Sequence, residues 1–433
     1  MRNRVIHNAA WIIGCRIVQS GLALLVTMLS ARYLGPSGYG LINYAASLVA
    51  FFVPIMQLGL NSTLVRELIS DPAHEGETMG TALAMTFISS IACVIGVAAV
   101  SMLLNQGESE AIWVCVLYSL LLVFQSLEMI QYWFQAKLLS KYTALTILAA
   151  YIVVSAYRIS LLITGSSIYW YAISQAVDYG IIAIVLLVLY RKLSGDKLKV
   201  SARRAADMLG RSRQYILSGM MITVFAQTDR VMLKLMLNES AVGYYSAAAS
   251  CATLTSFIFV AIIDSARPAI LENKQQSEEA FRQSMKMLYA VIIILALLQS
   301  AAITVLARPI IWILYGESYH ASVDALRIIV WFTTFSYLGA VRDVWILAEK
   351  KQQYLWIINL SGAAANVLLN AVLIPRYGIN GAAAASLITQ FFTNVIMGWI
   401  IRPIRANNQL MIQALDIGFL SSRLKEMKTG KNQ

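Results

Sequence analysis

The stretch QTDRVMLKLMLNESAVGYYSAAAS, residues 227–250, carries two signals that decide the fold. It places two charged side chains in the middle of an apolar segment. It also repeats an earlier stretch, LGPSGYGLINYAAS at residues 34–47, at a constant offset of 203 residues, which aligns Gly40 with Gly243. A match between the two halves of a chain at a constant offset is typical of a protein built from two copies of one unit. The sequence therefore predicts an internal repeat.

The composition is that of a membrane protein. Hydrophobic residues make up 59% of the 433 residues and charged residues 13%, whereas a soluble domain has about 25% charged residues. A net charge of +12 would suggest nucleic acid in a soluble protein, but basic residues here have a simpler role on cytoplasmic loops. The four cysteines form no CxxC pair and the three histidines no zinc motif. We therefore expect no nucleic-acid partner, no metal site and no cofactor.

Twelve apolar segments are long enough to cross a bilayer, which takes about 20 residues each. With both termini in the cytoplasm, 25 of the 34 lysines and arginines fall on the inner side and 4 on the outer side. This bias predicts cytoplasmic termini. The twelve predicted spans lie at about 9–31, 41–60, 80–104, 111–135, 143–164, 168–190, 214–236, 242–265, 286–307, 325–347, 354–374 and 380–401.

The fold class predicted from these spans is an all-α polytopic membrane protein with two lobes of six helices. Residues 1–190 form the N-terminal lobe and residues 214–402 the C-terminal lobe. The basic segment 191–213 between them is a cytoplasmic linker, whose pattern fits an interfacial helix on the anionic inner leaflet. Residues 403–433 form a basic cytoplasmic tail, and its apolar residues predict a short amphipathic helix on the membrane. That set is Leu410, Met411, Ala414, Leu415 and Phe419.

No catalytic signature is present. The sequence has no GxxxxGK[ST] phosphate loop, no HExxH and no GxSxG motif. We therefore predict no catalytic residues and no enzyme activity. A channel or a secondary transporter remains, with a membrane-embedded enzyme as the less favoured alternative.

Polar residues inside the predicted spans are the strongest functional signal. An ionisable side chain costs at least ~2.5 kcal/mol at the bilayer centre, so it should face water or protein. Four arginines and three acids meet this description: Arg16, Arg158, Arg230, Arg342, Glu128, Asp178 and Asp229. Helical spacing adds a polar stripe on both lobes, made of Gln125, Gln131, Gln175, Asn359, Asn366 and Asn370. Together they predict one hydrated cavity between the lobes.

A structural reading competes at each of these positions. Single Asn and Gln residues often join helices in membranes, and Asp229 and Arg230 could pair. Arg342 and Asp343 could each neutralise the other's neighbours, whereas Arg16 and Arg158 have no acid close by in the sequence. Fixed cations of this kind suit an anionic substrate such as a phosphate.

Five stretches resemble the bacterial polysaccharide flippases, the Wzx-type exporters of O-antigen repeat units in the multidrug/oligosaccharidyl-lipid/polysaccharide (MOP) superfamily. Each stretch is short, but the five occur in the right order, and the resemblance extends from about residue 9 to 402. The stretches are RYLGPSGYGLINYAAS (32–47), YWFQAKLLSKY (132–142), QTDRVMLKLMLNESAVGYYSAAAS (227–250), IIWILYGESYHASVDALRII (310–329) and LIPRYGINGAAAASL (373–387).

This resemblance implies a function and a location. Such proteins move an undecaprenyl-pyrophosphate-linked oligosaccharide from the cytoplasmic to the periplasmic leaflet of the bacterial inner membrane. They do so by alternating access coupled to an ion gradient. The four intramembrane arginines are then candidates to line the substrate lumen, and Glu128, Asp178 and Asp229 candidates for ion coupling. A polysaccharide polymerase and a chain-length regulator are the implied protein partners.

Two other functions compete. A multidrug exporter of the same superfamily would prefer an acidic, aromatic cavity for cationic drugs, and the arginines argue against it. A membrane-embedded polymerase or glycosyltransferase would need a large periplasmic loop or a nucleotide-sugar domain. The sequence shows neither.

Overall fold

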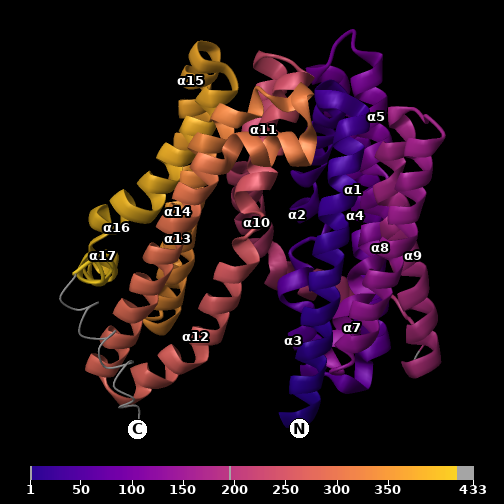
Figure 1. Ribbon diagram of the computed structural model, residues 1–433. Helices are drawn as coiled ribbons and strands as arrows, with labels where there is room; N and C mark the ends of the chain where they lie inside the picture. The colour runs from indigo at the N-terminus through magenta and orange to yellow at the C-terminus, as the bar shows by residue number, and fades with distance from the viewer. Residues whose placement is uncertain (1, 195–196, 417–433) are drawn as a thin grey trace. The chain divides into compact units, whose positions relative to one another are not determined.

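The computed structural model describes residues 2–194 and 197–416, with side chains for 18–193 and 197–416, and within this part every regular element is a helix (Figure 1). The predicted all-helical class is confirmed. The chain divides after Gly243 into two compact units. The seventh predicted span, in α10 (Ala202–Met236), belongs to the first unit, and the lobe boundary at 191–213 stays a prediction.

The first unit contains α1 to α10 and the start of α11. Their bounds are α1 Arg2–Ala50, α2 Val53–Met56, α3 Leu64–Ser70, α4 Glu75–Leu104, α5 Ser109–Ser119, α6 Leu121–Leu127, α7 Gln131–Ala136, α8 Ser140–Ile163, α9 Ile168–Ser194, α10 Ala202–Met236 and α11 Glu239–Thr253. The second unit continues with α12 Ser256–Gln276, α13 Glu278–Tyr315, α14 Ser322–Ala348, α15 Leu355–Phe391, α16 Met397–Ile400 and α17 Arg405–Gln413. Short 3₁₀ turns join several of them.

The helices are those of a multi-pass membrane protein. Among the described residues, seven helical stretches are long and apolar enough to cross a membrane, or eight if α11 and α12, bent by 43°, form one span. Large apolar side chains lie on their outer surfaces, and Ile163 is 81% exposed and Val305 77%. Burying such side chains in lipid removes the cost of exposing them to water. The count of twelve spans and the side of each terminus stay predictions.

Two of the long helices are bent at a glycine, and each bend lies between two predicted spans. In α1 the backbone at Gly35 has φ 66°, and in α15 Gly378 has φ 58°. This left-handed conformation ends a helix readily only at glycine. Pro36 follows Gly35 and fits the first turn of the next helical segment, where no amide hydrogen is needed.

The segment between the sixth and seventh predicted spans differs from its prediction. Instead of a separate interfacial helix, residues 202–213 are the first turns of the 35-residue helix α10. The extended residues before it dock on the start of α4, where the Lys199 amide donates to the Gly76 carbonyl at 3.2 Å. Arg204 then donates to the Asp71 carboxylate at 3.0 Å. Hydrogen bonds from His74 and Arg204 lower the pKa of Asp71.

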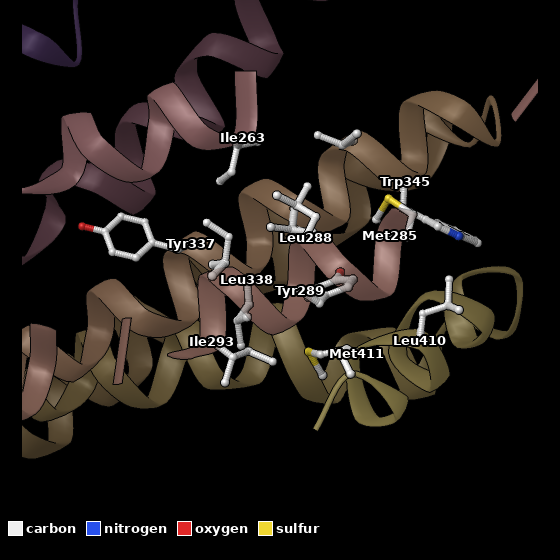
Figure 2. Packing of buried hydrophobic residues seen from close by; sticks show 14 of the residues in the cluster. Ile263, Met285, Leu288, Tyr289, Ile293, Tyr337, Leu338, Trp345, Leu410 and Met411 are labelled. Carbon is white, nitrogen blue, oxygen red and sulfur yellow. The ribbon is translucent and has the colours of Figure 1, made fainter. Parts of the chain in front are cut away.

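The C-terminal helix α17 also differs from its prediction. Leu410, Met411 and Ala414 were expected to lie on the membrane, but they are buried in the core of the second unit. Figure 2 shows Leu410 and Met411 near Tyr289 of α13, whose hydroxyl donates to Asn407 Oδ1 at 2.8 Å. An amphipathic pattern fits a protein core as well as a membrane surface. Phe419, from the same predicted helix, lies outside the described residues.

The repeat predicted from the sequence has a direct physical counterpart at Gly40 and Gly243. A Cβ atom on Gly40 would overlap the Glu239 carbonyl oxygen and lie 2.7 Å from the Gly243 nitrogen. A Cβ atom on Gly243 would overlap the Pro36 carbonyl oxygen. Glu239 stands 203 residues after Pro36, so each glycine packs on the repeat equivalent of the other's partner. The contact is self-complementary, as in a two-fold interface.

An ion-pair network surrounds this glycine contact. The side chain of Lys234, at the end of α10, is only 5% exposed and pairs with the carboxylates of Glu108 and, at 3.4 Å, Glu239. Ser37 Oγ donates to Glu239 Oε1 at 3.2 Å. These bonds fix the turn between α10 and α11 against α1.

Candidate functional site

Arg158, a predicted lumen residue, is held by one hydrogen bond between neighbouring helices. It lies on α8, half-buried, and its Nε donates to Ser174 Oγ of α9 at 2.9 Å. Ser174 is buried and donates in turn to the Tyr171 carbonyl at 2.7 Å. Within the described residues, the two terminal nitrogens of Arg158 make no hydrogen bond or ion pair of their own. A guanidinium anchored through Nε keeps its terminal fork available for a second partner.

Two acids predicted for ion coupling are linked to this arginine, one directly and one through the other acid. Asp178 of α9 is half-buried and interacts electrostatically with Arg158. Glu128, in the 3₁₀ turn Glu128–Ile130, is half-buried and feels the negative charge of Asp178. The Oδ1 atom of Asp178 is buried and has no hydrogen-bond partner among the described residues. A buried carboxylate oxygen without a partner is costly unless a proton, a cation or a water satisfies it.

Amides and tyrosines complete this group, which we call the Arg158 cluster. Gln175 hydrogen-bonds the side chain of Tyr118, and Gln125 Nε2 makes a long hydrogen bond of 3.5 Å to the Tyr179 hydroxyl. The members of the cluster are Tyr118, Gln125, Glu128, Tyr151, Arg158, Ser174, Gln175, Asp178 and Tyr179. Five predicted site residues thus come together within the first unit.

The tyrosines are functional candidates that the sequence reasoning missed, although a signal was present. Tyr118 precedes Gln125 by seven residues and Tyr151 precedes Arg158 by seven, while Tyr179 follows Gln175 by four. Residues at these spacings share one face of a helix.

The other predicted pair in the first unit is tied to α1. Arg230 donates from a terminal nitrogen to Gln227 Oε1 at 3.0 Å, and the same oxygen accepts from Ser47 at 3.0 Å. Asp229 is buried. Arg230 thus has a protein acceptor for its fork, unlike Arg158.

The guanidinium of Arg342, in the second unit, donates its hydrogen bonds to protein acceptors. It is buried and pairs with the neighbouring Asp343 at 3.0 Å, and one terminal nitrogen donates to the Thr393 carbonyl at 3.0 Å and to Asn394 Oδ1 at 2.8 Å. Thr393 and Asn394 belong to the π-helical segment Phe392–Ile396. These contacts favour the structural reading for Arg342.

The π-helical segment is stabilised from two sides. A π turn changes the hydrogen-bond pattern of the helix, and two of its carbonyls accept side-chain donors: Thr393 from Arg342, and Val395 from Asn408 at 2.7 Å. Gly339 makes room for this arrangement, because a Cβ there would overlap the Asn394 side chain.

Gly339→Ala is therefore expected to destabilise the second unit. It would displace Asn394 and remove an acceptor from a buried arginine, which costs about 1–3 kcal/mol. The melting temperature of the purified protein in detergent, followed by tryptophan fluorescence, should fall. Gly210→Ala is the control, since nothing lies within 4 Å of a Cβ at that position. An unchanged melting temperature for Gly339→Ala would contradict this role of the glycine.

The remaining predicted residues do not join the Arg158 cluster. Asn366 and Asn370 are buried on α15 and bonded to each other at 3.1 Å, and Asn359 on the same helix is half-buried. Gln131, in the first unit, is half-buried. The side chain of Arg16 lies outside the described residues. The single cavity predicted between the lobes stays a prediction.

Solved structures of transport proteins share this fold. A structure of the lipid II flippase MurJ in an inward closed conformation aligns with a TM-score of 0.74, at 14% identity, over 96% of this chain and 92% of MurJ. An inward-facing multidrug resistance MATE transporter of the MOP superfamily aligns with a TM-score of 0.68, at 14% identity, over 90% and 96%. A eukaryotic MATE transporter gives 0.59 at 13% identity, over 95% and 99%. This chain therefore shares the fold of these transport proteins.

The sequence family agrees with the fold. No curated protein sequence matches the chain. The profile of a family described as polysaccharide biosynthesis protein matches residues 5–274, more than half of the chain, and the predicted resemblance is confirmed. This protein belongs to the polysaccharide biosynthesis protein family.

Proposed function

We propose that this protein is a flippase of the bacterial inner membrane. Its substrate is an undecaprenyl-pyrophosphate-linked oligosaccharide repeat unit, which it moves from the cytoplasmic to the periplasmic leaflet by ion-coupled alternating access. The observation that carries the proposal is the family match over residues 5–274, which gives the polysaccharide pathway, on a fold shared with flippases and transporters. A polymerase and a chain-length regulator would receive the product.

The Arg158 cluster supplies the chemistry that such a substrate requires. The pyrophosphate is an anion, and the terminal fork of an anchored guanidinium can bind a phosphate with two parallel hydrogen bonds. Lipid-linked sugars also need a polar route, which the amides and tyrosine hydroxyls of the cluster provide.

Coupling follows from competition for Arg158. Asp178 and a phosphate both attract the Arg158 guanidinium, so the charge on Asp178 opposes phosphate binding. A proton or cation bound at Asp178 and Glu128 removes this competition and favours the phosphate. Release of the ion returns Arg158 to Asp178 and weakens the phosphate contact. Ion binding and substrate binding are thereby linked.

Deletion of the gene should stop the surface polysaccharide built from the repeat unit. Lipid-linked single units should accumulate on the cytoplasmic leaflet, because their synthesis does not depend on export. The measurement is lipid extraction with mass spectrometry, together with a blot for surface polymer. A plasmid copy should restore the polymer.

Two outcomes would contradict the proposal. One is normal polymer in the deletion strain when no other flippase gene is present. The other is sensitivity to cationic drugs as the sole phenotype, which would favour the multidrug alternative.

A further inference from the structure

The end of α13 and the start of α14 line a pocket, far in sequence from the Arg158 cluster. It is a cavity of about 330 Å³ lined by residues between Arg308 and Val323. Ligand pockets in proteins begin at about 300 Å³. In the predicted topology these residues face the outer side of the membrane.

Three polar side chains converge on this cavity without protein partners. Arg308, Glu317 and His320 line it and are exposed, and within the described residues their side chains make no hydrogen bond or ion pair. They offer a cationic donor fork, a carboxylate acceptor and an imidazole that can donate or accept. The indole of Trp312, 59% exposed, lines the same cavity.

The segment that forms the pocket also carries two packed tyrosines. Tyr315 and Tyr319, which alternate in sequence with the lining residues, are buried, with ring centroids 5.2 Å apart. Gly316, with φ 88°, ends α13 through hydrogen bonds from its amide to the Ile311 and Trp312 carbonyls. The backbone that carries the polar groups is therefore anchored by buried side chains and by the end of α13.

The pocket also lies where the second repeat is longer than the first. A second match, WFQA at 133–136 with WILA at 345–348, has an offset of 212 residues instead of 203. The outer segment 308–324 is correspondingly longer than its counterpart at 105–110. An addition made to one repeat only is not needed to build the shared fold.

We propose that this pocket binds a sugar residue of the exported oligosaccharide on the outer side of the membrane. A pyranose ring has an apolar C–H face, which fits the flat indole of Trp312, and a rim of hydroxyls or a carboxylate, which fits Arg308, Glu317 and His320. The assignment rests on the proposed flippase function for the source of the sugar. It adds an exit site to the Arg158 cluster, which would hold the pyrophosphate.

The test is binding of oligosaccharide fragments to the purified protein in detergent. Fragments released by mild acid from the host's own surface polysaccharide are the probe, and saturation-transfer NMR reports their contact. Trp312→Ala and Arg308→Gln should each weaken binding about tenfold or more. Arg308→Gln removes a hydrogen bond from a charged group, and Trp312→Ala removes the apolar contact with the sugar ring. Arg327→Gln is the control, because Arg327 is an exposed arginine near the pocket that pairs with Asp324 at 3.0 Å and does not line the cavity.

Three results would overturn the assignment. The unaltered protein could bind no fragment, both variants could bind the fragments as tightly as the unaltered protein, or the pocket could bind glycerol phosphate in place of the fragments. The last would make the pocket a lipid-headgroup site. Any of these results can occur while the deletion strain still accumulates lipid-linked units. In that case the proposed flippase function stands and only the sugar-binding assignment of the pocket is wrong. If the deletion strain accumulates no lipid-linked units, the proposed flippase function is wrong, whether or not fragments bind to the protein.

Discussion

Arg158→Glu should abolish export at normal membrane abundance. The substitution replaces the one guanidinium of the cluster with a carboxylate, which repels both the pyrophosphate and Asp178. Arg158→Ala should lower export about 10- to 100-fold, the effect of losing one hydrogen bond to a charged group. Arg158→Lys should keep part of the activity, since it retains the charge but loses the Nε bond to Ser174 and the planar fork. Export is measured in the deletion strain and normalised to protein level by immunoblot.

Two further variants separate substrate binding from structure. If Arg158 only neutralises Asp178, the double variant Arg158→Ala/Asp178→Asn should regain both abundance and export. If Arg158 binds the pyrophosphate, export by that double variant should stay low at normal abundance. Arg191→Glu, an exposed change near the C-terminal end of α9, is the matched control and should leave export intact. Normal export by Arg158→Glu would remove the residue from the substrate path.

Gly40→Ala and Gly243→Ala should each destabilise the protein, although alanine normally favours a helix over glycine by about 1 kcal/mol. A methyl group at either site would overlap backbone atoms of the facing segment. Overpacking costs about 1–3 kcal/mol and occasionally more, and the upper part of this range is expected because backbone yields less than a side chain. Both melting temperatures in detergent should fall.

The control for these variants is Gly210→Ala, which meets open space and should keep or raise the melting temperature. The double variant Gly40→Ala/Gly243→Ala provides a second test. Since the two sites share one contact, their effects should not add. Additive losses, or a rise in either melting temperature, would show that the two glycines are not in close contact.

Hydrophobic runs in the sequence predicted the helical membrane fold well, because each span needs only a local surplus of apolar residues. The offset of 203 residues also led to a contact that the structure shows at Gly40 and Gly243. The structures of the linker and the tail were harder to predict from the sequence. Leu410 and Met411 form an apolar helix face, and sequence alone does not say whether lipid or protein covers it.

The partners of each intramembrane charge were the least predictable part. The acid closest in sequence to Arg342 is Asp343, and the two do pair. Arg158 has no such neighbour, and the residues that surround it come from helices up to 40 residues away along the chain, among them Tyr118 and Asp178. Helix packing decides those contacts, and packing depends on many residues at once.

The contact between Gly40 and Gly243 also carries a record of ancestry. A self-complementary patch is what two identical chains form when they meet around a two-fold axis, so a half-length ancestor could have assembled as a homodimer through this glycine. Fusion of two such copies into one chain then lets equivalent positions diverge. Pro36 now starts a helix after a bend, while Glu239 pairs with Lys234. One position now follows a bend in α1, and its equivalent in the predicted repeat is a member of an ion pair.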